Sequence, residues 1–346
     1  MKKIVRFLCL LLVCALLLPC AGVSAAKGKE PYVFHFDADF SQESLAEVIE
    51  RYLKKKHLLG NNISIGWYDL QSGEEYYRNP DLFLEGASTY KLPMAMVYAD
   101  MIEAGGITLE DKVGPYVLRD ALEGILVWSN NPKARVLQAY LSEDKGEFKR
   151  MLIPNSGLDE SELPPQYFRS NNFSPRFLIG TLRTLYDNPE KYALLLDFLR
   201  QARPNDYISR YSGEIEVAHK YGSDAGFVCD TGIVYAERPF LLCVMCYGVG
   251  GAHLIISEIA RIAMDYADYL AAQPAPTPAP TPVPMPEPAP EPTPAPTPEP
   301  TPEPEQPDEP AAPEKHGSAL LPIAIAAGAA LLILPFRLKR KREKQP

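Results

Sequence analysis

Apolar residues recur at helical spacing through most of residues 41–270, while two blocks near the ends of that range alternate like strands. The helical spacing predicts helices over Ser41–Leu58, from about Ala87 to the glycine pair Gly105-Gly106, and over Arg119–Val127, Pro132–Leu141, Lys145–Leu152, Ser174–Tyr186, Pro189–Arg203 and Gly251–Leu270. The alternation predicts strands over Asn62–Leu70, Glu75–Arg78, Glu216–Tyr221, Gly226–Tyr235 and Phe240–Tyr247. This order predicts an α+β fold, in which an antiparallel five-stranded sheet is flanked by the terminal helices and the middle helices form an all-helical lobe.

The N-terminal residues 1–25 are typical of a signal peptide rather than of a folded element. Basic residues precede the apolar run 7–18, and the small residues at 23–25 offer a cleavage site. A lipoprotein anchored through Cys20 is the alternative, although Pro19 stands where a small residue is expected.

The C-terminal part of the chain predicts a stalk and a membrane anchor. Residues 273–317 alternate proline with alanine, threonine and glutamate, which favours an extended, disordered stalk. Residues 318–337 form an apolar run long enough for one transmembrane helix, and the basic residues 338–346 should stay in the cytoplasm. A buried core helix is the alternative for the run. The remaining residues, 27–272, suffice for one folded domain, which we expect to be extracellular.

Composition narrows the partners of this domain. The chain carries a net charge of −9, partly from stalk glutamates. Residues 27–272 contain no basic cluster of the kind that would indicate nucleic-acid binding. Three cysteines lie in the domain, so that Cys229 and Cys243 could form one disulfide with Cys246 left over, or all three could be buried thiols. Neither their spacing nor the scattered histidines predicts a metal site, and we expect no cofactor and a monomer.

Ser88 and Lys91 form a Ser-x-x-Lys pair near the expected start of a helix. Unpaired N–H groups and the helix dipole favour developing negative charge at that end. A serine hydroxyl needs a base beside it, and a lysine kept partly dry can lose its proton and serve as that base. The pair is therefore a candidate nucleophile and base, with a helix cap followed by a solvated lysine as the alternative.

Two further stretches offer polar groups that a hydrophobic core does not need. Ser129 and Asn131 lie in a loop between two predicted helices, where a helix-capping turn is the alternative interpretation. Lys220 and Gly222 end a predicted strand, where a charged group and bare backbone can approach a ligand. A lysine on an edge strand is the alternative there.

In chain order the three stretches read Ser-x-x-Lys, Ser-x-Asn and Lys-x-Gly, which resembles class A β-lactamases and penicillin-binding proteins. Residues 87–93 resemble that family's nucleophile segment almost residue for residue. Residues 173–175 resemble its Thr-Thr-Pro segment, and residues 230–233 also fit. The resemblance covers roughly residues 41–270 and implies a β-lactamase/transpeptidase-like fold.

The resemblance also implies a role for each matching residue. Ser88 would attack a β-lactam or a D-Ala-D-Ala amide, and Lys91 would assist its deprotonation. Ser129 would pass the proton to the leaving nitrogen, aided electrostatically by Lys220. Asn131 would hold the substrate's side-chain amide. The oxyanion would lie between the backbone N–H groups of the nucleophile and of Ser223.

The chain departs from the family's pattern at several positions. Asn130 stands where β-lactamases usually have Asp. Tyr221, beside the expected Gly222, replaces a residue whose hydroxyl binds the substrate carboxylate. A class A β-lactamase also needs a glutamate that activates the water for deacylation. Residues 158–162 resemble the family's Leu-Asp-x-x-Glu, which would make Glu162 that base, with a surface acidic turn as the alternative.

Two functions remain open from the sequence. The first is a membrane-anchored serine hydrolase that acts on β-lactams or cell-wall peptides, either as a β-lactamase or as a D,D-peptidase. The second is a binding module for penicillin or peptidoglycan that is acylated slowly or not at all.

Overall fold

The computed structural model describes residues 34–273 and contains a five-stranded antiparallel sheet. The strand order is β2-β1-β9-β8-β7, with β1 at Ile63–Asp69, β2 at Glu75–Arg78, β7 at Val217–Asp224, β8 at Phe227–Val234 and β9 at Phe240–Tyr247. The N-terminal hairpin joins the C-terminal strands through β1 and β9, where Trp67 lies opposite Leu242. This arrangement confirms the predicted fold class, and it places β7 at an edge of the sheet.

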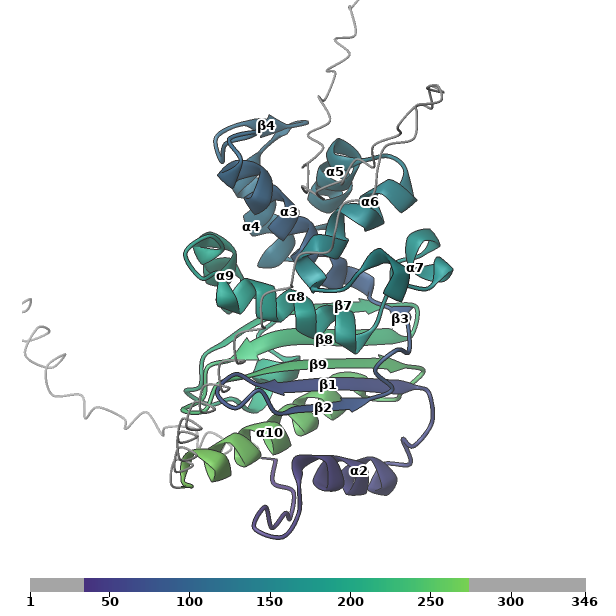
Figure 1. Ribbon diagram of the computed structural model, residues 1–346, viewed down its shortest axis with the longest axis vertical. Coiled ribbons are helices and arrows are strands. Elements are labelled where there is room, and N and C mark those ends of the chain that lie inside the picture. The colour runs from purple at the N-terminus through teal and green to yellow at the C-terminus, as the bar shows by residue number, and fades with distance from the viewer. Residues whose placement is uncertain (1–33, 274–346) are drawn as a thin grey trace, which may run out of the picture. The chain divides into compact units, whose positions relative to one another are not determined.

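Two helices from the ends of the described chain cover one face of the sheet, as Figure 1 shows. They are α2 (Leu45–Lys55) and α10 (Ala252–Ala271), and their apolar stripes pack with the sheet residues Trp67 and Leu242 in one hydrophobic core. Helix α2 begins later than the sequence predicted. Ser44, not Ser41, caps it, because Ser44 and Glu47 satisfy each other's backbone N–H groups in a capping box.

The other face carries the helical lobe (Figure 1). Its helices are α3 (Lys91–Glu103), α4 (Leu118–Leu126), α5 (Asn131–Leu141), α6 (Lys145–Leu152), α7 (Pro165–Arg169), α8 (Pro175–Asp187) and α9 (Ala193–Arg200). Helix α8 packs directly on the sheet, where a Cβ on Gly66 would lie 2.7 Å from Ile179 Cγ1. The middle helices therefore form the predicted lobe, although α9 is shorter at both ends than expected.

Several short elements were not predicted. Strand β3 (Leu84–Glu85) pairs with β6 (Asn172–Phe173), and β4 (Lys112–Val113) pairs with β5 (Tyr116–Val117). The 3₁₀ helices are η1 (Ala87–Tyr90), η2 (Ile153–Ser156), η3 (Glu160–Glu162) and η4 (Tyr207–Tyr211). Only Gly86 separates the end of β3 from η1, which contains the candidate nucleophile Ser88.

The three cysteines of the described residues are buried free thiols, so the disulfide between Cys229 and Cys243 is not formed. The strand register explains this, because Cys229 lies opposite Met245 and Cys243 lies opposite Thr231. The two cysteines are thus two positions out of register. Burial raises the pKa of the Cys246 thiol to about 12.

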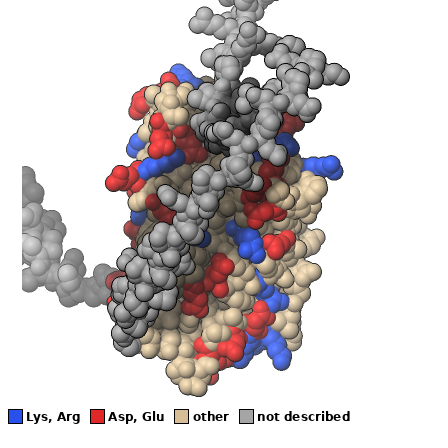
Figure 2. Space-filling view, viewed as in Figure 1, with Lys and Arg blue, Asp and Glu red and all other residues tan. Residues whose placement is uncertain are grey.

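The predicted signal peptide, stalk, transmembrane span and basic tail lie outside the described residues. Within residues 34–273, no helix is both long and apolar enough to cross a membrane. Figure 2 shows acidic and basic side chains interspersed over the visible face of this part of the chain. A mixed surface of this kind creates no extended field of one sign on that face.

Candidate active site

Ser88 lies in η1, at the junction between the edge strand β7 and the helical lobe. Thr89 stabilises the first turn of this 3₁₀ helix, because its backbone N–H and its side-chain hydroxyl both donate to Gly86 O, at 2.9 and 2.7 Å. Ala87 has a φ of +47°, which is unusual for a residue with a side chain. Backbone strain of this kind occurs preferentially at functional sites. Ser88 itself is half-buried, so its hydroxyl is both held and reachable.

Lys91 is fully buried at the start of α3, and its amine meets four oxygen atoms. Its Nζ lies 2.9 Å from Ser88 Oγ, 2.6 Å from Asn131 Oδ1, and 2.7 and 3.2 Å from the carbonyl and hydroxyl oxygens of Ser129. Burial, assisted by the charge of Arg135, lowers the pKa of Lys91 to about 8. A neutral lysine amine has a lone pair that can accept the Ser88 proton.

Ser129 connects the two lysines predicted from the sequence. Lys220 Nζ donates to Ser129 Oγ at 3.1 Å and to Tyr221 O at 2.7 Å. Burial, and then repulsion by the charge of Lys91, lowers the pKa of Lys220 to about 7. Because both amines contact one hydroxyl, Ser129 can pass a proton between Lys91 and Lys220. Ser129 holds this position with a φ of +53°.

A cavity of about 240 Å³ opens beside the nucleophile and is lined by Glu85, Ala87, Ser88, Tyr90, Asn131, Asn171, Ser223 and Asp224. Gly222 brings β7 against the nucleophile, since a Cβ on Gly222 would lie 2.6 Å from Ser88 N. The backbone next to Ser88 and Ser223 therefore borders the same hollow, as an oxyanion site requires.

The structure thus brings Ser88, Lys91, Ser129 and Lys220 into one hydrogen-bond network, with Asn131, Gly222 and Ser223 around it. The capping alternative also holds in part, because Asn130 caps α5 by accepting from Lys133 N at 2.9 Å.

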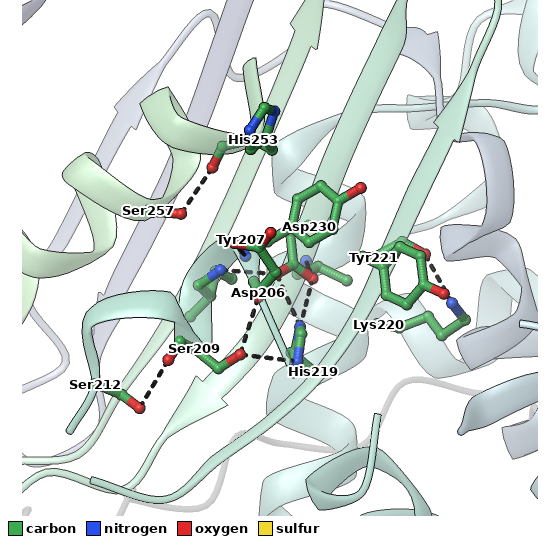
Figure 3. Close-up of polar contacts among 12 residues, drawn as sticks. Asp206, Tyr207, Ser209, Ser212, His219, Lys220, Tyr221, Asp230, His253 and Ser257 are labelled. Atoms are coloured by element: carbon green, nitrogen blue, oxygen red, sulfur yellow. Dashed lines mark hydrogen bonds and ion pairs between the residues drawn. The ribbon is translucent and has the colours of Figure 1, made fainter. Parts of the chain in front are cut away.

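Tyr221 does not occupy the position expected of a substrate-binding hydroxyl. Its phenol donates to Arg203 O, its ring stacks on Tyr207, and Lys220 Nζ lies 4.2 Å from the ring centroid. Figure 3 shows the phenol beside Lys220. The hydroxyl is thus engaged by the backbone, and Tyr221 braces the lysine instead of lining the cavity beside Ser88.

A buried polar group lies next to Lys220 along β7. His219 Nδ1 is 2.8 Å from Asp230 Oδ2, and His219 Nε2 is 3.4 Å from Ser209 Oγ (Figure 3). Consecutive strand residues point to opposite faces, so His219 faces away from the lysine side. Asp230 also accepts from Ile208 N at 3.1 Å, which ties η4 to β8 beneath the site.

Glu162 lies outside the nucleophile's cavity, which favours the surface-turn alternative. It is exposed in η3, and its carboxylate accepts from Asp159 N at 2.7 Å within a capping box. The hollow that it borders contains Arg176 and Arg183 but not Ser88.

Three residues that line the cavity lie outside every stretch singled out from the sequence, namely Glu85, Asn171 and Asp224. The only available signal was the spacing of Glu85, three residues before the nucleophile.

Comparison with known proteins shows the family to which the chain belongs. The model of the β-lactamase enzyme family matches residues 43–267, which is well over half of the chain. The chain belongs to the β-lactamase enzyme family. A search of curated proteins found no match. The family's fold supports serine-dependent acyl transfer in general.

Several solved structures are similar to this chain in fold, at low sequence identity. A β-lactamase from Chitinophaga pinensis is 17% identical with a TM-score of 0.55, covering 63% of this chain and 98% of its own. TLA-1 extended-spectrum β-lactamase is 19% identical with a TM-score of 0.55, covering 64% and 97%. A PBP-A mutant, solved as an acyl-enzyme complex with penicillin G, is 18% identical with a TM-score of 0.54, covering 64% and 96%. Such likeness shows the fold.

Proposed function

We propose that the protein is a membrane-anchored, extracellular serine hydrolase that forms an acyl-enzyme with β-lactams or D-Ala-D-Ala cell-wall peptides. The observation that carries the proposal is the continuous hydrogen-bond network that joins Ser88 Oγ to two buried lysine amines through Ser129. A buried amine with a lowered pKa is the base that a serine nucleophile needs.

Acylation follows from this network. Neutral Lys91 takes the proton from Ser88 Oγ as that oxygen attacks the carbonyl carbon of the substrate. Backbone N–H groups of Ser88 and Ser223 stabilise the oxyanion that forms. Ser129 Oγ then donates its proton to the leaving nitrogen and recovers one from Lys91, which carries the proton taken from Ser88, and the Lys220 amine beside Ser129 assists this transfer electrostatically. Asn131, on the cavity wall, holds the substrate's acyl side chain.

The location is proposed from the sequence at both ends. Residues 1–25 would direct export, 318–337 would cross the membrane, and 338–346 would hold the cytoplasmic end. The intervening stalk, 273–317, could extend to about 120–140 Å at about 3.1 Å per residue, which lets the domain reach cell-wall peptides above the membrane.

A penicillin-binding module that is acylated but barely hydrolysed is the second candidate. The observation that favours it is the position of Glu162, which is exposed and outside the cavity with Ser88. Without a base near the acyl ester, the adduct would persist.

Fluorescent penicillin tests the proposal on the full-length chain purified in detergent. We expect covalent labelling of wild type and none of Ser88→Ala, with Ser161→Ala, an exposed serine, as the matched control. Nitrocefin then separates the candidates, because a hydrolase turns over many equivalents and a binding module gives a single stoichiometric burst. Absence of labelling in the wild type would rule out acyl transfer to β-lactams.

A further inference from the structure

The nucleophile's cavity contains a carboxylate that the sequence did not predict. Glu85 is the last residue of β3, is half-buried, and lines the same cavity of about 240 Å³ as Ser88. Glu162, the sequence candidate for a base, borders a different hollow. The position of a carboxylate relative to the acyl ester decides whether it can activate water for hydrolysis.

Asn171 holds Glu85 in this place. Its Nδ2 donates to Glu85 Oε1 and also to Ala87 O, at 2.7 Å, so one amide spans from the carboxylate to the residue before the nucleophile. The backbone is tied as well, because Gly86 N donates to Asn171 O at 2.9 Å. Cys229 Sγ donates to Glu85 O at 3.4 Å.

This clamp leaves part of the carboxylate available. Among the described residues, Glu85 Oε2 accepts no hydrogen bond, whereas Oε1 accepts the one from Asn171. A water bound in the cavity can therefore donate to the carboxylate while it faces the acylated serine. Asp224 lines the same cavity but is exposed at the end of β7 and receives no such clamp within residues 34–273.

We propose that Glu85 is the general base that hydrolyses the acyl-enzyme, an inference that rests on the proposed acylation of Ser88. Its carboxylate takes a proton from water as the water oxygen bonds to the ester carbonyl carbon. The tetrahedral intermediate collapses with cleavage of the bond between that carbon and Ser88 Oγ. The proton on Glu85 returns to Ser88 Oγ, directly or through Lys91, and the carboxylic acid product leaves.

The test uses the full-length chain and separates acylation from deacylation. Fluorescent penicillin measures the rate of adduct formation, and mass spectrometry follows the lifetime of the adduct after excess reagent is removed. In Glu85→Gln, which keeps the shape and an acceptor for Asn171, we expect acylation within about threefold of wild type. The adduct should last roughly 100-fold longer, since a general base contributes about 10²–10⁴-fold. Glu162→Gln, the matched control outside this cavity, should keep the wild-type lifetime.

Each other outcome has a meaning. A wild-type adduct that is hydrolysed no faster than that of Glu85→Gln overturns the assignment of Glu85 and leaves acyl transfer standing. A Glu85→Gln chain that folds, by its melting transition, but is not acylated also overturns it, because Glu85 would then act earlier. If Glu85→Gln does not fold, Glu85→Asp decides, and an unchanged adduct lifetime in that variant refutes the proposal. Absence of any adduct in the wild type defeats the proposed function itself.

Discussion

Gly222 offers a direct test of how closely β7 must approach the nucleophile. A Cβ at this position would lie 2.6 Å from Ser88 N and 2.7 Å from Gly86 O. Both neighbours are backbone atoms, so neither can rotate away as a flexible side chain would. Gly222→Ala should therefore push β7 and η1 apart by roughly 0.8 Å to reach an ordinary contact of about 3.4 Å.

This displacement acts on the two backbone N–H groups proposed to bind the oxyanion, those of Ser88 and Ser223. Losing one oxyanion donor costs about 3–4 kcal/mol, and a misplacement of about 1 Å can cost roughly 100-fold. We therefore expect Gly222→Ala to acylate about 10²–10³-fold more slowly than wild type. The overpacking should also lower the free energy of unfolding by about 1–3 kcal/mol.

The assay is the second-order rate of labelling by fluorescent penicillin, measured beside a urea unfolding curve for each protein. Gly250→Ala is the matched control, because a Cβ there would meet nothing within 4 Å. It should label at the wild-type rate. If folded Gly222→Ala labels within about threefold of wild type, the close approach of β7 is not needed and the reasoning about the oxyanion site is wrong.

Two further predictions concern the groups around the lysines. Acylation needs an unprotonated Lys91, whose pKa is lowered to about 8, so the labelling rate should fall about tenfold per pH unit as the pH falls below about 8. A profile that stays flat from pH 7 to 5.5 would exclude a lysine base. Asp230→Asn weakens the buried bonds from His219 and from the backbone and should lower the free energy of unfolding in urea by about 2–4 kcal/mol. The exposed control Asp224→Asn should change it by less than about 0.5 kcal/mol; equal effects would refute this role of Asp230.

Much of the fold could be predicted because long elements carry their own period. The strands β2 and β9 and the helix α6 have the bounds that the sequence predicted. The apolar stripe of α10 and the alternation of β1 also predicted that a terminal helix packs on the sheet. Strand β7 extends to Asp224, three residues beyond the prediction, because the lysine, glycine and serine there obscure the alternation that pairing with β8 maintains.

The site was predictable only where chemistry-bearing residues follow a motif. The Ser-x-x-Lys spacing made Ser88 a candidate nucleophile, whereas the role of Lys220 was implied by the family resemblance, and the structure brings both residues into one network. Glu85 could not be assigned a role, because a two-residue strand has no periodicity and its partner Asn171 lies far away in sequence. The backbone acceptor of the Tyr221 phenol, Arg203 O, could not be predicted either, since no local pattern reveals it.

The proposed base and the nucleophile share one short segment of chain, which bears on how hydrolysis could survive without Glu162. Glu85 closes the β3–β6 pair, and Ser88 follows it in η1 three residues later. The pairing that places Asn171 against the carboxylate also fixes the backbone just before the nucleophile. Changes in the loop that carries Glu162 would leave this pairing intact as long as β6 stays in register. Acylation and hydrolysis would then depend on the same local geometry, and the exposed position of Glu162 would not by itself make the protein a binding module.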